Sequence, residues 1–461
     1  MTSSKAVSRY DMTQGDIFRK LLFISLPVMG GTFMQMAYTL ADIFWLARLS
    51  TEAVVAASTA GMFLWMSLGL MLMVRIGTEI GVSQCVGKGD SDKARGYAQT
   101  GIWTALPLGV AFGAVMVIGR APLVAFFDIP SEQVVRYAQN YLSISGFSVP
   151  FMYVSAVIGA SFAGSGNTRL PFAVQSAGLL ANIVLTPVLI FGADMGLEGA
   201  AYATIIARTI EITLFLLAAK FYPNRPFAKF PIFVRPNIQR LRDILRWGFP
   251  VAVETITFSL LSMLIARMVA QWGVEAMAAQ RVTFQIESLS WLVGAGFGSA
   301  MTAFVGQNYG AGKWTRIHRG FKTAVLSMTL WGLAVSVYLL VFADHLIAIF
   351  LHDPVEIALG AALLRMLAVC QIPQAIEGAM AACFRGRGVT VKPSVVSVTC
   401  NVSRVILAYI LNIYFGLFGI WWAIIIGACA RGLWMLLWFM WDRRSLPTED
   451  TVPDNSGLSH V

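Results

Sequence analysis

The sequence predicts an all-α polytopic membrane protein, with twelve transmembrane helices in two six-helix lobes related by a parallel internal repeat. The composition and an ordered match between the two halves carry this prediction: the 461 residues are 57% hydrophobic and only 13% charged. An ordinary soluble domain is about a quarter charged, and a soluble globule of this composition would expose far more apolar surface than water tolerates. The composition therefore excludes a soluble enzyme, a disordered chain and a coiled coil.

The membrane spans follow from apolar stretches of about the length, roughly 20 residues, that crosses the hydrocarbon core. The predicted spans are 21–46, 54–76, 97–118, 138–161, 171–191, 198–219, 246–269, 279–303, 321–342, 358–382, 394–413 and 418–440. The first stretch is too long for the apolar core of a signal peptide and contains Asp42, so we expect it to be a retained helix.

The Lys and Arg residues outside these spans lie mostly on one side of the membrane. With these boundaries, 24 lie on the side of the N-terminus and three, Arg48, Arg120 and Arg136, on the other. Because basic loops stay on the cytoplasmic side, we expect a multi-pass protein of the cell (inner) membrane with both termini in the cytoplasm. The net charge of +10 then indicates contact with the lipid bilayer surface and not with nucleic acid.

The two halves of the chain resemble each other at a shift of about 223 residues. The matching segments are Pro27-Val28 with Pro250-Val251, Gln84–Gly89 with Gln307–Gly312, and Gly164–Pro171 with Gly386–Pro393. An ordered series of this kind over nearly the whole chain indicates a duplication. Because each half has an even number of spans, the repeat is parallel, and transporters built this way bind substrate between the halves near the membrane midplane.

The repeat sets the expected domain boundaries. They are an N-terminal lobe at 1–220, a cytoplasmic linker at 221–245, a C-terminal lobe at 246–442 and a cytoplasmic tail at 443–461. Apolar residues of the linker recur at helical spacing from Ile238 to Leu245, which predicts either a short helix on the cytoplasmic surface or a lead-in to the seventh span. The tail is polar, and we expect residues 445–461 to be disordered.

Asp42, near the end of the first span, is the leading candidate for ion or proton coupling. Tyr38 and Gln35 precede it by four and seven residues and share its helix face, which is therefore polar. The nearest cation is Arg48, six residues on and expected at the outer surface. Because a carboxylate at this depth is costly by several kcal/mol, an unpaired acid here is expected to titrate when an ion or a proton arrives.

With these motifs the sequence resembles the MATE family, the multidrug and toxic compound extrusion transporters, of bacterial type. The resemblance rests on Leu40-Ala-Asp42 in the first span and on the repeated patterns at Gln84–Gly89 and Gly164–Pro171, and it covers about residues 15–440. It implies two lobes that export organic cations and other amphiphiles against an inward flow of Na⁺ or H⁺.

The resemblance also implies an ion site in the first half. The DinF-type branch of the family carries Asn-x-x-x-Asp-Pro in the fifth span, where this chain reads Asn182-x-x-x-Thr186-Pro187, and Thr204 in the sixth span matches the same site. The replaced acid leaves Asp42 with neutral oxygens. Because a dehydrated Na⁺ needs several close oxygens and gains from charge, we expect H⁺ to be the coupling ion in preference to Na⁺.

The second half supplies further candidates. Glu254 matches the acidic position of the seventh span in the NorM-type branch, whose acid in the tenth span aligns with Gln374, one turn from Glu377. The candidate coupling residues are thus Asp42, Asn182, Thr186, Thr204, Glu254 and Glu377. The candidate substrate-binding residues are Gln35, Tyr38, Gln175, Gln285, Glu287 and Gln374. We expect Arg267, Arg281, Arg365 and Arg404 to neutralise the acids of the second half, and Arg208 to pair with Glu211 three residues on.

The predicted function is secondary active multidrug efflux by alternating access, in which amphiphilic drugs or toxins leave in exchange for H⁺ or Na⁺. One alternative is a lipid-linked saccharide flippase, which would hold several unpaired arginines in a central cavity. Another is a membrane-embedded enzyme, but the four histidines do not cluster in spans. No Walker lysine motif, His-Glu-x-x-His pair or metal-ligand cysteine spacing occurs, so we expect a monomer without enzymatic activity, cofactor or metal site.

Overall fold

The computed structural model describes residues 10–221, 237–444, 446–448 and 450, and every secondary-structure element within these residues is a helix. By its internal packing the chain divides into two compact units, and each is described by itself. The first consists mainly of Leu26–Ala252. The second consists of Met12–Ser25 and the described residues from Val253 onward. The all-α prediction is therefore confirmed.

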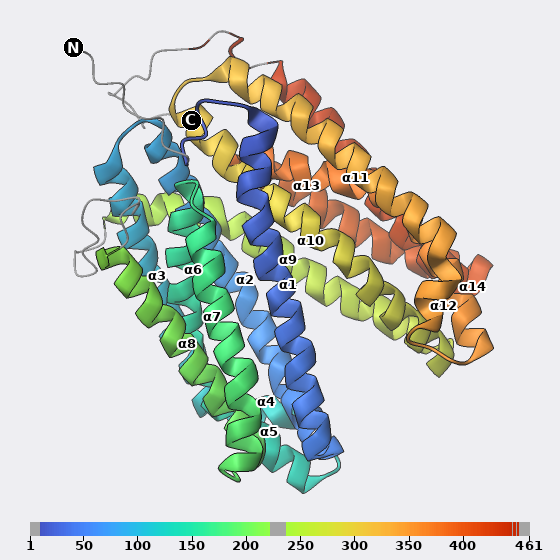
Figure 1. The fold of residues 1–461 in the computed structure, drawn as a ribbon. Coiled ribbons are helices and arrows are strands. Elements are labelled where there is room, and N and C mark those ends of the chain that lie inside the picture. Colours follow the sequence, from blue (N-terminus) through green and yellow to red (C-terminus); the bar gives the residue numbers. More distant parts are fainter. Residues whose placement is uncertain (1–9, 222–236, 445, 449, 451–461) are drawn as a thin grey trace. The chain divides into compact units, whose positions relative to one another are not determined.

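The helices of the first half follow the predicted spans (Figure 1). They are α1 (Ile17–Leu49), α2 (Thr51–Gly87), α3 (Ser91–Ile118), α4 (Arg120–Ala125), α5 (Glu132–Gly146), α6 (Val149–Gly164), α7 (Arg169–Pro187), the π-helical turn η1 (Val188–Gly192) and α8 (Gly196–Phe221). Ser50, Asp90 and Ser131 begin α2, α3 and α5, because each side-chain oxygen accepts a hydrogen bond from a backbone N–H of the first turn.

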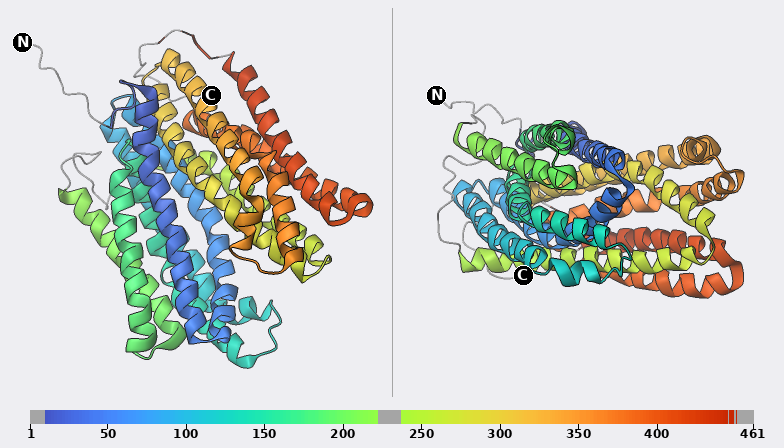
Figure 2. Two further views of the ribbon diagram at one scale, coloured as in Figure 1. Left: turned by 45° about the vertical axis from the view of Figure 1, so that its right-hand side comes forward. Right: turned by 90° about the horizontal axis from the view of Figure 1, so that it is seen from below.

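The second half repeats this order of long helices. They are α9 (Ile238–Ala270), α10 (Val274–Gly310), α11 (Trp314–Ala348), α12 (Pro354–Ala368), α13 (Gln371–Gly386) and α14 (Val391–Arg443). Within the second unit α10, α11 and α13 pack on one another (Figure 2). At about 1.5 Å per residue, the 53 residues of α14 would extend roughly 80 Å, far beyond the hydrocarbon core of about 30 Å. Gly416, with φ 59° and ψ −141°, breaks α14 into two spans.

The structure has the twelve predicted spans. Among the described residues, nine helices are long and apolar enough to cross a membrane, and two bent pairs, α5 with α6 and α12 with α13, pass the same test together. The division of α14 at Gly416 supplies the remaining span. The helices extend beyond several of the predicted edges; α2, for example, runs from Thr51 to Gly87, whereas the predicted span is 54–76.

The two bent pairs lie at equivalent places in the repeat. The bend is 43° between α5 and α6 and 52° between α12 and α13. Pro150 and Pro373, which are 223 residues apart, each stand within the first three residues after the bend. Proline has no backbone N–H and clashes with the preceding turn, so it starts a helix more readily than it continues one. The sequence analysis predicts each pair as a single span, 138–161 and 358–382, and the prolines are the signal in the sequence for the bend inside it.

The loops whose sequences match between the two halves also have matching backbone geometry. Gly89 and Gly312 have φ of 77° and 67°, and Gly166 and Gly388 have φ of 89° and 81°. These values lie in the left-handed region, which glycine adopts at little cost. The shared motifs are therefore turns that end one span and lead into the next in both halves.

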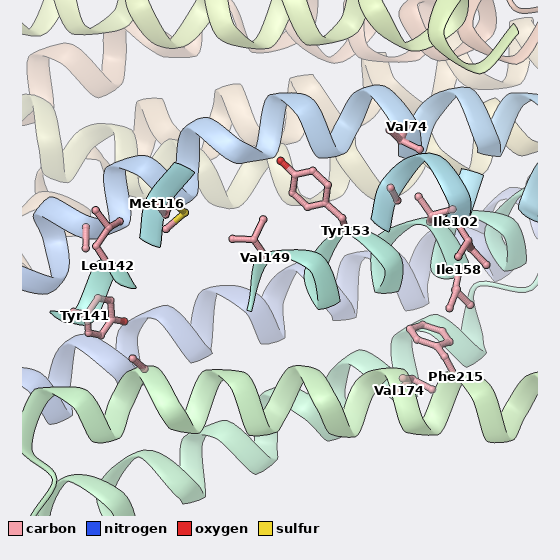
Figure 3. Packing of buried hydrophobic residues seen from close by; sticks show 14 of the residues in the cluster. Val74, Ile102, Met116, Tyr141, Leu142, Val149, Tyr153, Ile158, Val174 and Phe215 are labelled. Atoms are coloured by element: carbon pink, nitrogen blue, oxygen red, sulfur yellow. The ribbon is translucent and has the colours of Figure 1, made fainter. Parts of the chain in front are cut away.

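The core of the first unit combines aromatic side chains with close backbone approaches (Figure 3). Tyr153 is fully buried, and its hydroxyl donates a hydrogen bond to the backbone carbonyl oxygen of Ser67 at 2.7 Å. A Cβ added to Gly109 of α3 would lie 2.8 Å from the backbone of Pro150, and one added to Gly113 would lie 2.5 Å from the carbonyl oxygen of Gly146. Glycine at these positions therefore lets α3 pack closely on α5 and α6, as small residues do in membrane bundles.

Two helices change unit part-way along their length. The segment Met12–Ser25, which includes the start of α1, packs into the second unit, where Met12 is fully buried. The start of α9 packs into the first unit, where Ile244 is buried and a Cβ on Gly248 would lie 1.8 Å from the carbonyl oxygen of Met73. Each change of unit falls within a few residues of the repeated prolines of α1 and α9.

In the described part of the linker the structure decides between the two alternatives, and in the described part of the tail it differs from expectation. Helix α9 runs unbroken from Ile238 to Ala270, so 238–245 leads into the seventh span and a separate surface helix is wrong. In the tail, the Asp450 carboxylate accepts a hydrogen bond from the Thr315 backbone N–H at 2.9 Å. Disorder is therefore the wrong expectation for this part of the tail, because it is hydrogen-bonded to the start of α11. Residues 222–236, 445, 449 and 451–461 lie outside the described part of the chain.

Candidate ion and substrate sites

Asp42 lies on α1 in the first unit, and its carboxylate has no counter-ion there. Its Oδ1 atom is buried without a hydrogen-bond partner, and no salt bridge to Asp42 occurs among the described residues. The guanidinium of Arg48 lies instead over the ring of Phe44, 4.5 Å from its centroid. The predicted unpaired acid is therefore present in the part of the chain that the structure describes.

Neutral oxygens from α7 and α8 form a hydrogen-bonded group in the same unit. Thr186 Oγ1 donates to Asn182 Oδ1 at 3.0 Å, and Asn182 Nδ2 donates to Thr204 Oγ1 at 3.3 Å. Asn182 and Thr186 are buried, with 2% and 1% of their surface exposed. The one-turn spacing of Asn182 and Thr186 puts both on the α7 face toward α8, which brings together three of the residues that the family resemblance implied.

A buried ion pair lies beside this group. Arg208 Nη1 contacts Glu211 Oε2 at 2.9 Å, and Ser155 Oγ donates to the same oxygen at 3.1 Å. Glu211 is 1% exposed, and a Cβ on Gly178 of α7 would lie 2.4 Å from its Cγ. Glycine at 178 thus makes room for the carboxylate between α7 and α8. The pair predicted from the three-residue spacing is confirmed.

Tyr38 connects Asp42 with the ion pair. Its phenol lies close enough to Asp42, Arg208 and Glu211 to interact electrostatically with all three. Tyr141 of α5, which sequence reasoning missed, is buried and interacts with Asp42 in the same way. No regular spacing links α5 to α1, so the sequence offered no signal for Tyr141.

The second unit contains a cavity of about 340 Å³ that several predicted residues line. Glu254, Gln374 and Glu377 lie in its wall, and so does Arg431, which the sequence analysis did not single out. The aromatic part of the lining consists of Phe258, Trp291 and Trp331. The cavity therefore offers flat apolar surfaces together with charges of both signs.

Both acids in the wall of this cavity have basic partners. Arg431 Nε donates to Glu377 Oε2 at 2.7 Å. Glu254 Oε2 lies 3.5 Å from Arg385 Nη2 and accepts a hydrogen bond from Ser394 Oγ at 3.0 Å. Unlike Asp42, these two carboxylates are therefore already compensated.

Glu287 of α10 is held behind the cavity wall. It is 3% exposed, and its Oε1 accepts a hydrogen bond from Nε2 of Gln371, a cavity-lining residue, at 3.1 Å. Glu287 therefore supports the wall through Gln371, and it is not itself among the lining residues.

The four arginines that the sequence analysis expects to neutralise these acids do not pair with them. Arg365 pairs with Asp344, and Arg267 and Arg281 are exposed. Arg404 stacks over the ring of Phe258, 5.5 Å from its centroid. The true partners, Arg385 and Arg431, follow Glu254 and Glu377 by 131 and 54 residues, distances over which sequence spacing carries no information.

The remaining substrate candidates fall in different places. Gln175 of α7 is half-buried, with Nε2 3.5 Å from the position of a Cβ on Gly159. Gln35 and Gln285 are exposed, and Gln285 is not among the residues that line the cavity. The described residues contain no group of three or more His, Cys, Asp or Glu side chains that could hold a metal ion.

Comparison with known proteins identifies the architecture. The MatE family model matches residues 27–188 and again residues 250–410, so it covers most of the chain and finds both halves of the repeat. The chain belongs to the MATE family. Its members are transporters and not enzymes, and membership excludes the membrane-embedded enzyme considered above.

Relatives of the chain are similar over nearly their full length. The probable multidrug resistance protein NorM of Thermotoga maritima is 27% identical over 454 residues, 95% of this chain and 96% of the relative. The multidrug export protein MepA of Staphylococcus aureus is 22% identical over 456 residues, 96% of this chain and 98% of the relative. The similarity to proteins named for multidrug resistance and export thus extends over nearly the whole aligned length of each.

Solved MATE structures share the fold. A MATE in complex with MaD3S superposes with a TM-score of 0.89 at 23% identity, covering 96% of this chain and 99% of the other. A MOP-superfamily transporter from Pyrococcus furiosus also has a TM-score of 0.89, at 22% identity and the same coverage. The multi-pass fold is therefore that of a MATE transporter. The flippase alternative is not favoured, and one of the arginines it rested on, Arg365, pairs with Asp344.

Proposed function

We propose that this MATE transporter is a secondary antiporter, which exports amphiphilic drugs or toxins, organic cations among them, in exchange for H⁺ by alternating access. One observation carries the proposal: the Asp42 carboxylate is partly buried in the first unit with no cation paired to it. The names of the relatives, which include a multidrug export protein, support small amphiphilic molecules as the exported class.

The free-energy cost of keeping the Asp42 carboxylate charged provides a way to couple proton binding to conformational change. A charged carboxylate inside a membrane protein costs several kcal/mol unless it is paired, and protonation removes that cost. Proton binding therefore stabilises the conformation of the transporter that buries Asp42 more deeply. If two conformations differ in this burial, protonation shifts the equilibrium between them. One charge moving inward down 100 mV supplies about 2.3 kcal/mol.

The neutral group on α7 and α8 favours H⁺ over Na⁺. Asn182 Oδ1 already accepts the Thr186 hydroxyl, and Thr204 Oγ1 accepts from Asn182, so these oxygens point into hydrogen bonds with one another. A dehydrated Na⁺ would have to replace those bonds and would find a single charged ligand, Asp42. A proton needs only that one carboxylate.

The distribution of basic residues supports a location in the cell (inner) membrane with both termini on the cytoplasmic side. The chain folds into two units with their own cores, and we propose that a single chain is the transporting species.

Inverted membrane vesicles test the coupling ion. The vesicles carry a pH-sensitive dye and a preformed pH gradient, and ethidium is added in buffer with and without Na⁺. We expect ethidium to dissipate the pH gradient in Na⁺-free buffer. Strict dependence on Na⁺ would contradict H⁺ coupling, and no response to ethidium with either ion would contradict export of organic cations.

A further inference from the structure

The cavity of the second unit presents a charge pattern that a simple cation does not match. Two acids and one base line it, Glu254, Glu377 and Arg431, and Arg385 contacts Glu254 from the side. Each carboxylate is therefore already compensated. A ligand with one positive charge would meet Arg431 while finding no unpaired acid, so the site gives it no net electrostatic attraction.

The Arg431–Glu377 pair still has bonding capacity on both partners. Arg431 uses Nε for Glu377 and Nη1 for Asn401, and Glu377 accepts through Oε2. Among the described residues, Arg431 Nη2 and Glu377 Oε1 have no hydrogen-bond partner, and neither belongs to the buried unsatisfied atoms. The two side chains remain 16% and 15% exposed. Side by side, the pair offers N–H donors for an anion and a carboxylate oxygen for a cation.

The rest of the cavity wall suits a ligand with an aromatic ring system. Phe258, Trp291 and Trp331 provide flat surfaces, on which rings stack favourably. Gly294 and Gly378 also line the cavity, and a Cβ at either would have no atom within 4 Å. A volume of about 340 Å³ lies at the lower end of the range for small-molecule sites.

From these features we infer that the second-unit cavity binds an aromatic zwitterion, whose carboxylate contacts Arg431 and whose neighbouring ammonium contacts Glu377. The inference rests on the proposed export function, because it names the substrate class that this cavity selects. It also assigns separate roles to the two units. Asp42 in the first unit binds and releases the proton, and the Arg431–Glu377 pair in the second unit recognises the substrate.

A matched series of fluorescent probes tests this inference on the purified full-length protein in detergent. Nε-dansyl-lysine carries an ammonium and a carboxylate on one carbon, dansylcadaverine lacks the carboxylate, and 6-(dansylamino)hexanoic acid lacks the ammonium. Binding is measured at equilibrium by energy transfer to the dansyl group from the tryptophans of the protein, of which Trp291 and Trp331 line the cavity. We expect the zwitterion to bind at least tenfold more tightly than either singly charged probe.

Variants of the pair assign the selectivity. Arg431→Gln is expected to reverse the preference: dansyl-lysine loses its carboxylate partner and binds at least tenfold more weakly, whereas dansylcadaverine binds no more weakly than before, because Glu377 has lost its salt bridge. If a lone Glu377 prevents folding, the double variant Arg431→Gln with Glu377→Gln removes both charges together, and it should bind all three probes with similar affinity. Equal affinity of the wild type for the zwitterion and the cation, or selectivity that survives in either variant, would overturn the inference.

A steric variant tests the location without touching a charge. Gly294→Leu places a side chain in open space within the cavity and should abolish binding of dansyl-lysine while the protein stays monodisperse. Full binding by this variant would overturn the location. No gradient is present in these assays, so they are independent of the vesicle experiment: loss of proton exchange contradicts the antiport mechanism, and loss of probe selectivity contradicts the zwitterion site.

Discussion

At the scale of single residues, the buried and half-buried carboxylates differ in whether an arginine compensates their charge. Asp42 stands without a counter-ion, whereas Glu254, Glu377 and Glu211 are each paired with an arginine. An unpaired buried acid is poised to exchange a proton, and a paired one resists doing so because the arginine stabilises its charge. Within the first unit the contrast singles out Asp42 as the acid poised to exchange a proton, while Glu287 of the second unit has an amide partner, Gln371, in place of an arginine.

The Arg208–Glu211 pair yields the first prediction. Glu211→Gln leaves the Arg208 guanidinium without its counter-ion beside buried groups, and removing one partner of a buried pair typically costs about 3–5 kcal/mol. We expect a clearly lower midpoint of thermal denaturation than in the wild type. The midpoint is measured by size-exclusion chromatography of samples heated to a series of temperatures. The double variant Arg208→Gln with Glu211→Gln should lose less than the single one, and a larger loss in the double variant would contradict this account of the pair.

Sequence reasoning at this scale succeeded where partners lie within a turn or two of one helix. Asp42 with Tyr38, Asn182 with Thr186, and Arg208 with Glu211 were all visible as spacings of three or four. Arg431 and Tyr141 could not be found this way, because their partners Glu377 and Asp42 lie on other helices. Packing between helices sets those contacts, and a single sequence does not reveal it.

At the scale of elements, the repeated loop motif in the second half has a visible role. The Met12 backbone N–H donates to Gln307 Oε1 at 2.9 Å, and Asn308 Nδ2 and Arg316 Nε donate to the Met12 carbonyl oxygen, each at 3.1 Å. Lys313 Nζ donates to the Thr13 carbonyl oxygen at 2.9 Å. The α10–α11 loop thus anchors the segment that leads into α1, the helix that also carries Asp42.

This anchor leads to the second prediction. Met12→Ala removes a fully buried side chain from the core of the second unit, and such truncations cost about 2–5 kcal/mol. We expect a lower thermal midpoint than in Met62→Ala, where the side chain is 50% exposed. Equal midpoints for the two variants would show that the segment before α1 does not contribute to the second unit's stability.

The bends within the fourth and tenth spans show what an apolar-stretch prediction omits. Hydropathy locates a span but not a change of direction inside it, and the bends depend on Pro150 and Pro373. The same holds for α1 and α9, which were predicted at the right places, whereas their passage from one unit to the other depends on interhelical packing. The break at Gly416 falls in the gap between the predicted spans 394–413 and 418–440.

At the scale of the whole molecule, duplication accounts for most of what the sequence predicted. The apolar stretches predicted twelve spans and the ordered matches at a shift of about 223 residues predicted their division into two halves. The family model matches the chain twice at the same offset. The units are nevertheless chemically unequal. An unpaired acid lies in one, and a charged aromatic cavity lies in the other. A shared fold with different side chains allows one half to specialise in coupling and the other in recognition.

The third prediction concerns orientation. In a background with the five native cysteines replaced, single cysteines are introduced as Lys88→Cys, between α2 and α3, and Ser131→Cys, before α5. The positive-inside rule predicts that a membrane-impermeant maleimide labels Ser131→Cys in intact cells and labels Lys88→Cys only after the cells are broken. The reverse pattern would place both termini outside and contradict the proposed direction of proton flow.

The role of Asp42 is the central claim, and proteoliposomes containing Asp42→Asn test it most directly. The amide keeps the size of the side chain but cannot exchange a proton. Asp344→Asn is the matched control, because Asp344 forms an exposed pair with Arg365, and such pairs contribute little. Ethidium is added to vesicles with an imposed pH gradient, and proton flux is followed with an enclosed dye, with equal amounts of folded protein inserted. We predict substrate-dependent proton flux from the wild type and Asp344→Asn and none from Asp42→Asn. Wild-type flux from Asp42→Asn would contradict the account.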